Sequence, residues 1–127
     1  MARDPSERPT PPGRPAAGTI FYLLFGPIVW SLHFLAIYGP QSLLCARGLP
    51  EAVGPTLMGA TLVCGLALLA AILAPERLAR LMKAAHWPAE RQAFLDTVMR
   101  ALAGLSLFAV LAGGAGGLIL PACPGLR

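Results

Sequence analysis

The sequence predicts an all-α integral membrane protein with three transmembrane helices. Charged residues make up 13% of the chain, about half of the roughly 25% that is usual in soluble proteins. Three windows contain no Asp, Glu, Lys or Arg, namely residues 15–46, 52–75 and 101–126. They hold 32, 24 and 26 residues, and about 20 apolar residues suffice to cross a bilayer. A soluble three-helix protein would carry a charged face on each helix, and none of these windows provides one.

The predicted organisation has a tail, a membrane domain and a second, shorter tail. Residues 1–18 hold five prolines and charges of both signs, a composition typical of a disordered cytoplasmic tail. Residues 19–120 form the three-helix transmembrane domain. Within this domain the spans are expected at about 19–46, 50–74 and 93–120, with a cytoplasmic amphipathic loop at 75–92. A short outer tail follows at 121–127.

The first helix contains two Gly-Pro pairs, Gly26-Pro27 and Gly39-Pro40. Each proline removes a backbone donor and presses on the preceding turn, so we expect a bent helix, or one that ends near Gly39 and restarts. A cleaved signal peptide is the alternative for this segment. Its apolar core is 25 residues long, from Ile20 to Leu44, which exceeds the roughly 7–15 residues of a secretory signal.

The second helix is expected to begin at Pro50 and to end at Pro75. The segment that follows is amphipathic, so its apolar side chains should enter the membrane interface while its basic ones face lipid phosphates. The apolar set is Leu78, Leu81 and Met82, and the basic set is Arg77, Arg80 and Lys83. The third helix is expected from Pro88, with Asp96 and Arg100 paired across one turn before the chain enters the bilayer.

The distribution of Lys and Arg predicts the orientation, because cytoplasmic loops carry the excess of positive charge. Eight basic residues precede the first span or follow the second, whereas only Arg47 and Arg127 fall on the other side. The N-terminus is therefore predicted to be cytoplasmic and the C-terminus outside, as in a multi-pass protein of the bacterial inner membrane. The net charge of +4 reflects this topology and predicts no nucleic-acid binding, since the basic residues do not surround stacking aromatics.

One ionisable side chain, His33, lies near the middle of the first span. It shares a helix face with other polar or small residues, and this face should point into the bundle or at a partner because lipid cannot satisfy an imidazole. The stripe comprises Gly26, Trp30, His33, Ile37 and Gln41, with Cys45 at its outer edge. We take Trp30, His33 and Gln41 as interface candidates.

Three roles are open for His33. It can ligate haem or a metal, relay protons, or donate one hydrogen bond between helices, worth about 1 kcal/mol. The three uncharged windows contain no second histidine and, by definition, no Asp or Glu, so a haem ligand pair would need a homodimer and a proton path through the bilayer lacks carboxylates. The interhelical hydrogen bond is the role we expect, and no cofactor is predicted.

The cysteines are informative by position, since Cys45 closes the first helix and Cys123 follows the third. In an oxidising outer compartment they can form a disulfide, the outcome we expect over two unpaired thiols. Copper(I), a soft metal, is the alternative ligand, with Met58 as a third donor. Cys64 lies in the middle of the second span, where it behaves as a small apolar residue.

The outer half of the third helix is rich in glycine. Gly113 and Gly117 form a GxxxG pair within "LAGGAGGLIL", and such a face allows another helix to approach closely. The approaching helix can belong to the same chain or to a second protein, and the sequence leaves both open.

The segments "GPIVWSLHFLAIYG" and "LPACPGLR" resemble a group of small uncharacterised three-helix proteins of the proteobacterial inner membrane. The matching positions are Trp30, His33, Phe34, Tyr38, Cys45 and Cys123. Some members are associated with gene clusters of haem–copper terminal oxidases. The resemblance implies a respiratory-membrane setting and carries no activity with it.

No set of residues in the sequence suggests catalysis, because there is no phosphate-binding glycine loop and no Ser/His/Asp set. We therefore expect a non-enzymatic accessory or assembly factor that docks on a larger membrane complex, such as a terminal oxidase, or on itself as a homo-oligomer. The alternative is a haem-binding, copper-binding or thiol redox carrier that uses His33 or Cys45 and Cys123. The third alternative is a small transporter subunit. Three spans rarely enclose a transport path unless the protein forms an oligomer, which argues against this alternative.

Overall fold

The computed structural model describes residues 14–84, 86–120 and 123. This part of the chain forms five α-helices and one short 3-10 helix and contains no strand. In chain order the elements are α1 (Arg14–Leu23), α2 (Phe25–Ala46), η1 (Pro50–Ala52), α3 (Val53–Leu73), α4 (Pro75–Leu81) and α5 (Ala89–Ile119).

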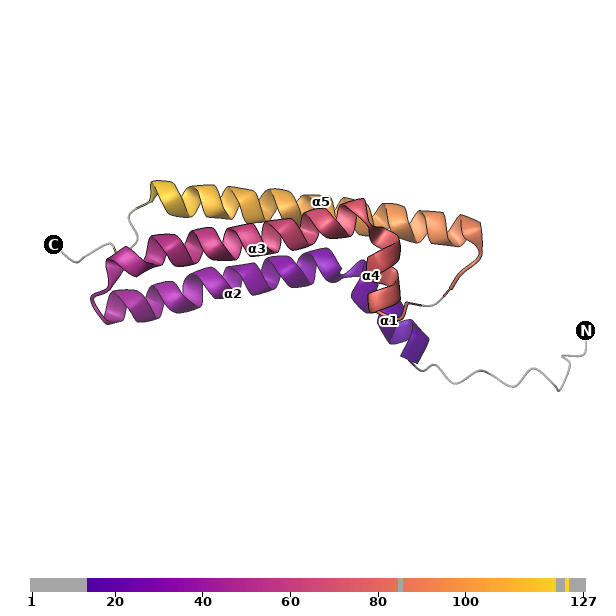
Figure 1. The fold of residues 1–127 in the computed structure, drawn as a ribbon, viewed down its shortest axis with the longest axis horizontal. Helices are drawn as coiled ribbons and strands as arrows, with labels where there is room; N and C mark the ends of the chain where they lie inside the picture. Colours follow the sequence, from indigo (N-terminus) through magenta and orange to yellow (C-terminus); the bar gives the residue numbers. More distant parts are fainter. Residues whose placement is uncertain (1–13, 85, 121–122, 124–127) are drawn as a thin grey trace, which may run out of the picture.

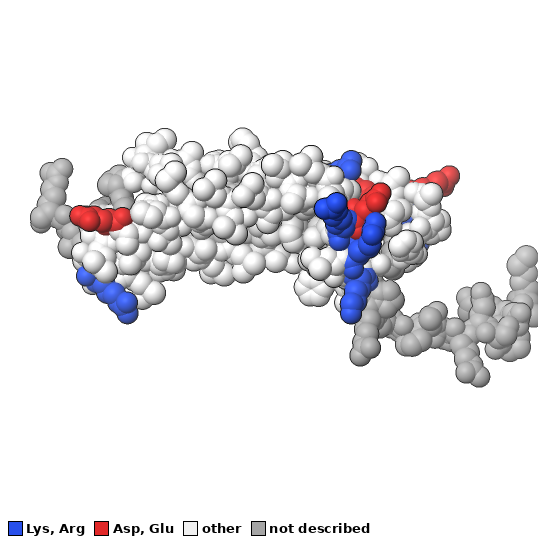
Figure 2. All heavy atoms as spheres, viewed as in Figure 1, with Lys and Arg blue, Asp and Glu red and all other residues white. Residues whose placement is uncertain are grey.

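Three long helices form a bundle in which α2 and α5 run in the same direction and α3 runs antiparallel to both, and α1 and α4 lie together at one end of it (Figure 1). The segments Phe25–Ala46, Pro50–Leu73 and Ala89–Ile119 are each long and apolar enough to cross a membrane. The charged side chains on the face shown gather at the two ends of the bundle and leave an uncharged band between them (Figure 2). The all-α class and the three candidate spans predicted from the sequence are therefore confirmed.

Helix α5 is longer than a bilayer core requires. Its 31 residues extend about 46 Å, whereas the hydrocarbon core of a bilayer is about 30 Å thick. Every charged residue of α5 lies in its first twelve positions, at Glu90, Arg91, Asp96 and Arg100. If the uncharged stretch from Ala101 onward occupies the hydrocarbon, the first three turns of α5 stand at the level of the lipid headgroups.

The first predicted helix is two helices, separated at Leu24 (φ −87°, ψ 5°). The break lies at the turn before Pro27, whose missing N–H would have bonded the Leu23 carbonyl and whose ring presses on the same group. Pro40, by contrast, lies inside α2 without ending it. The predicted bend is thus present, and its position follows from the first Gly-Pro pair alone.

The predicted boundaries shift at two other places. Helix α1 begins at Arg14, so residues 14–18 are helical and do not belong to a disordered tail, while residues 1–13 lie outside the described part of the chain. Helix α5 begins at Ala89 with Pro88 as its N-cap residue, which confirms the expected helix start at Pro88 and makes the end of the predicted loop 75–92 helical. Of the predicted outer tail 121–127, the structure describes only Cys123.

The core runs along the axis of the bundle. Its most deeply buried side chains are Tyr22, Leu68, Met99 and Val110, and Leu78 of α4 belongs to the same cluster. Leu78 therefore does not enter the membrane interface as predicted, because α4 crosses the end of the bundle and turns this residue onto the core. Leu81 is 78% exposed, as an interfacial side chain should be.

Helices α2 and α5 touch closely at Gly26. A Cβ atom placed there would lie 2.9 Å from the backbone Cα and N of Ala103, which is shorter than any van der Waals contact. Toward the far end of the bundle the two helices leave a groove between them.

Candidate functional site

A groove of about 590 Å³ lies between α2 and α5, with α3 as its third wall. All five residues that the sequence marks as interface candidates line it, namely Trp30, His33, Gln41, Gly113 and Gly117. The polar stripe of the first span and the glycine face of the third thus meet around one concave surface. The structure does not show what this surface contacts, and its role as an interface stays a prediction.

The α2 wall of the groove is an aromatic row. Trp30, Phe34 and Tyr38 follow one another at four-residue spacing, with ring centroids 6.0 Å and 4.3 Å apart, and all three are exposed. The polar stripe predicted from the sequence includes Trp30 but not Phe34 and Tyr38. Their i, i+4, i+8 spacing, which puts side chains on one helix face, was the available signal.

The α5 wall is made largely of glycine. A Cβ atom at Gly117 would lie 2.7 Å from Leu57 Cδ2, and one at Gly114 would lie 2.7 Å from Thr61 Cγ2. A Cβ at Gly113 would reach His33 Cε1 at 3.8 Å, whereas one at Gly116 would meet nothing within 4 Å. The GxxxG pair therefore packs against helices of the same chain, and Gly116 leaves the groove open.

His33 is 2% exposed at the base of the groove. Its Nε2 lies 3.1 Å from the Oγ1 of Thr61 on α3, and the Thr61 hydroxyl donates its own proton to the Leu57 carbonyl at 2.8 Å. Since that proton is already committed, Thr61 Oγ1 accepts and Nε2 carries the hydrogen. His33 therefore joins α2 to α3. Thr61 was missed by sequence reasoning, because nothing local to it indicates its partner.

The structure brings Cys45 and Cys123 together at the end of the bundle where α2 and α5 finish. The two sulfur atoms lie at disulfide distance, with the Cα atoms 5.8 Å apart, as the expected pairing requires. Disulfide sulfurs are not the thiolates that bind metals, so a copper(I) site on Cys45, Cys123 and Met58 would require the reduced protein and stays a prediction. Cys64 is a free, half-buried thiol.

The chemistry of the groove is apolar with a few hydrogen-bonding groups. Its lining includes no Asp, Glu, Lys or Arg, and His86 lies at the other end of the bundle, in the loop before α5. Among the described residues, no three His, Cys, Asp or Glu side chains gather into a metal-binding cluster.

No protein-family model, curated protein or solved structure matches this chain.

The His33–Thr61 hydrogen bond gives a prediction about tolerance. His33→Gln keeps a donor and should change stability little, whereas His33→Leu should cost about 1 kcal/mol, the usual value of such a bond between membrane helices. Thr61→Val should lower stability by a similar amount. The double variant His33→Leu, Thr61→Val should lose less stability than the sum of the two single losses, because each single variant already removes the shared hydrogen bond. Thermal unfolding in detergent measures all four proteins. Additive losses would show that the two side chains do not interact.

Proposed function

We propose that this chain is a non-enzymatic accessory or assembly subunit of a larger membrane complex, and that the groove between α2 and α5 receives a transmembrane helix of its partner. The observation that supports this is the convergence of the aromatic row and the glycine wall on one open groove. The sequence resemblance favours a haem–copper terminal oxidase as the complex.

A helix is the occupant that the two walls suit. Gly116 leaves open space on the α5 wall, since nothing lies within 4 Å of a Cβ atom built there, and this allows a neighbouring backbone to approach within packing distance. The exposed rings of Trp30, Phe34 and Tyr38 supply a large apolar contact area on the opposite side. Because the lining carries no charged side chain, an apolar segment can enter it without leaving a buried charge unpaired.

The test is site-specific photo-crosslinking in native membranes. A crosslinker in place of Phe34, which lines the groove and is 49% exposed, should react with a transmembrane segment of a partner protein. One in place of Leu66, which is 64% exposed on α3 and does not line the groove, is the matched control and should react only with lipid. Crosslinks at both positions, or at neither, would contradict the proposal, and crosslinks only to a second copy would replace it with a homo-oligomer.

A pair of glycine variants tests whether the open groove is needed. Gly116 and Gly104 both lie on α5 with nothing within 4 Å of a built Cβ, but only Gly116 lines the groove. Gly116→Leu should therefore abolish the Phe34 crosslink while Gly104→Leu preserves it. Equal crosslinking in the two variants would show that the groove is not the contact.

The orientation is part of the proposal, with the N-terminus cytoplasmic and the C-terminus outside a bacterial inner membrane. Eight basic residues against two support it. A reporter fused after Arg127 should be active only outside the cytoplasm, and one inserted at Lys83 only inside it. The reverse pattern would place Cys45 and Cys123 in a reducing compartment and contradict the orientation.

The disulfide supports a second candidate, a thiol redox carrier. A carrier of haem or copper, using His33 or the cysteines, belongs to the same alternative. Purified protein should be colourless and free of copper if the accessory role is correct. A Soret band or stoichiometric copper would favour the carrier.

A further inference from the structure

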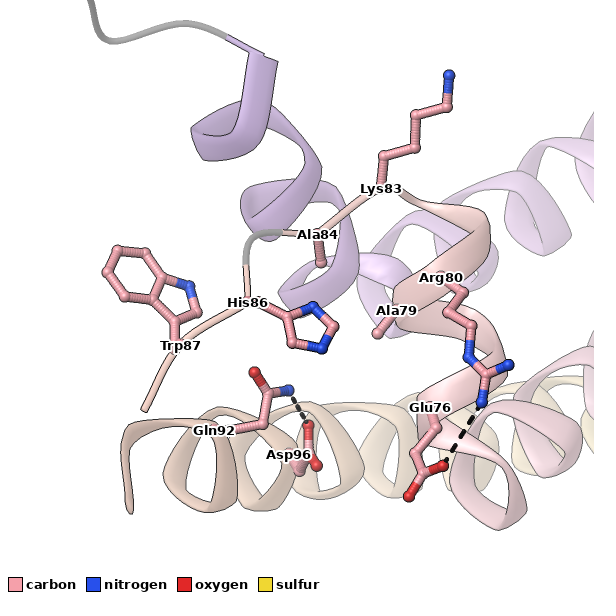
Figure 3. Close-up of a pocket in the computed structure, with 9 residues that line it drawn as sticks. All are labelled: Glu76, Ala79, Arg80, Lys83, Ala84, His86, Trp87, Gln92 and Asp96. Atoms are coloured by element: carbon pink, nitrogen blue, oxygen red, sulfur yellow. Dashed lines mark hydrogen bonds and ion pairs between the residues drawn. The ribbon is translucent and has the colours of Figure 1, made fainter. Parts of the chain in front are cut away.

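A second cavity, of about 440 Å³, lies at the opposite end of the bundle from the disulfide. It is enclosed by α4, the loop before α5 and the first turns of α5 (Figure 3). Its polar lining consists of Glu76, Arg80, Lys83, His86, Gln92 and Asp96. None of these residues belongs to the groove.

The level of this cavity matches the headgroup layer of a bilayer. Asp96 lies five positions before Ala101, or about 7 Å along α5, and a headgroup layer is about 5–8 Å thick on each side. Leu81 and Trp87 flank the cavity with exposed apolar surface, and tryptophan favours the membrane–water boundary. The cavity should therefore open among lipid headgroups.

The charges that line the cavity cancel. Arg80 and Lys83 contribute two positive charges and Glu76 and Asp96 two negative ones, while the His86 imidazole points into the space between α4 and α5 (Figure 3). A purely anionic group would meet both carboxylates, and a purely cationic one would meet the Arg80 guanidinium, whereas the Lys83 ammonium points away from the other lining side chains (Figure 3). A ligand that carries both signs can pair with each.

Asp96 is fixed in place as an acceptor. The predicted pair with Arg100 is not among its described contacts, and it accepts hydrogen bonds from Tyr22 Oη at 2.7 Å and from Gln92 Nε2 at 2.9 Å. Both bonds fall on Oδ1, so within the described part of the chain Oδ2 is left to accept others. Burial, and then the Asp96 hydrogen bond and charge, raise the pKa of the Tyr22 phenol, which keeps it a donor.

Arg80, on the facing helix, is available for an anion. Its guanidinium lies 3.9 Å from Glu76, and both side chains are largely exposed. Such a long surface pair contributes little stability. The guanidinium can therefore turn to a phosphate, for which its planar fork of donors is suited.

We propose that this cavity binds the phosphoethanolamine group of a phospholipid, with the ammonium on Asp96 Oδ2 and the phosphate on Arg80 and His86. A primary ammonium fits because it can donate hydrogen bonds to the open carboxylate oxygen. A choline headgroup cannot do so and is recognised by aromatic faces. Trp87 lines the cavity, but the Arg91 guanidinium already lies over its ring, 4.9 Å from the centroid, so a choline cation would have to compete with an arginine for this indole.

Native mass spectrometry of the full chain in detergent tests this with short-chain phosphatidylethanolamine, phosphatidylcholine and phosphatidylglycerol. We expect the ethanolamine lipid to bind about fivefold more tightly than the other two, the ratio that one partly exposed ion pair supplies. Equal binding of the three lipids would overturn the proposal. Soluble glycerophosphoethanolamine should compete only weakly, because the lipid is also held by its acyl chains. Competition as strong as that of the lipid would make a soluble phosphoethanolamine the ligand.

Two matched pairs of variants locate the effect. Asp96→Asn should remove the preference, whereas Glu90→Gln, a carboxylate on the same end of α5 outside the lining, should keep it. Arg80→Gln should also weaken binding, while Arg77→Gln on the same short helix should not. The Arg80 side chain is 77% exposed, so its loss should not disturb folding even if Asp96→Asn does. An equal effect of pocket and control variants would show that only general surface charge is involved.

Discussion

Removing the Cys45–Cys123 disulfide is expected to lower the free energy of unfolding more than the loss of any single hydrogen bond between the helices. The bond joins residues separated by 78 positions, and a closed loop of this size is worth about 4.5 kcal/mol in the chain-entropy model. A chain that stays inserted when its tertiary contacts are lost is already restricted, so the measured value should be somewhat smaller. The double variant Cys45→Ser, Cys123→Ser, unfolded thermally in detergent, should show this loss.

Two controls isolate the effect to that bond. Cys64→Ser changes a free, half-buried thiol and should alter stability only through local packing. Maleimide applied to denatured but unreduced protein should label Cys64 alone, and after reduction it should label all three cysteines. Labelling of Cys45 and Cys123 without reduction, or a double variant as stable as the wild type, would contradict the pairing.

Gly26→Ala is expected to destabilise the bundle by about 3 kcal/mol, at the upper end of the usual cost of overpacking a core. The added methyl group would lie 2.9 Å from the Ala103 Cα and N and from the Leu102 carbonyl oxygen. These are backbone atoms, which cannot rotate away as the end of a side chain can. The change can be accommodated only if α2 moves away from α5, which would also disturb the groove.

Gly39→Ala is the matched control, on the same helix with nothing within 4 Å of the added methyl group. Each glycine is followed by a proline, so the restriction that a proline places on the preceding Cβ is common to both variants, and the loss at Gly39 should be well below that at Gly26. Thermal unfolding of both variants gives the comparison. Equal losses would mean that α2 tolerates no side chain at either glycine, and would contradict the close contact inferred at Gly26.

Features that depend on short stretches of chain were predictable. The three uncharged windows predicted the three candidate spans because the cost of burying charge in hydrocarbon is paid residue by residue. The two Gly-Pro pairs predicted a bend in the first helix, since a proline acts on the carbonyl four positions earlier, but the break lies before Pro27 and not near Gly39. The expected position and partner of Cys45 also followed, because helix ends in a small bundle lie near one another.

Features that depend on distant residues were not predictable. The periodicity of residues 75–83 suggested a helix lying on the membrane, but Leu78 covers the core because α4 crosses the end of the bundle. The one-turn spacing predicts a pair between Asp96 and Arg100, but Asp96 accepts hydrogen bonds from Gln92 and from Tyr22, which is 74 positions away. A local sequence pattern indicates only the hydrogen-bond partners that lie within a turn or two of a residue, and it carries no information about partners on other helices.

By itself the sequence determined the helical class, the three spans and the residues that carry polar chemistry within them. Those properties follow from the solvent, since a bilayer selects for apolar composition and internal backbone hydrogen bonds. Only the tertiary structure decided that Trp30, His33, Gln41, Gly113 and Gly117 line one groove, and that Thr61 is the partner of His33. These relations depend on the rotation and the register of each helix about its axis, which packing against the neighbouring helices sets.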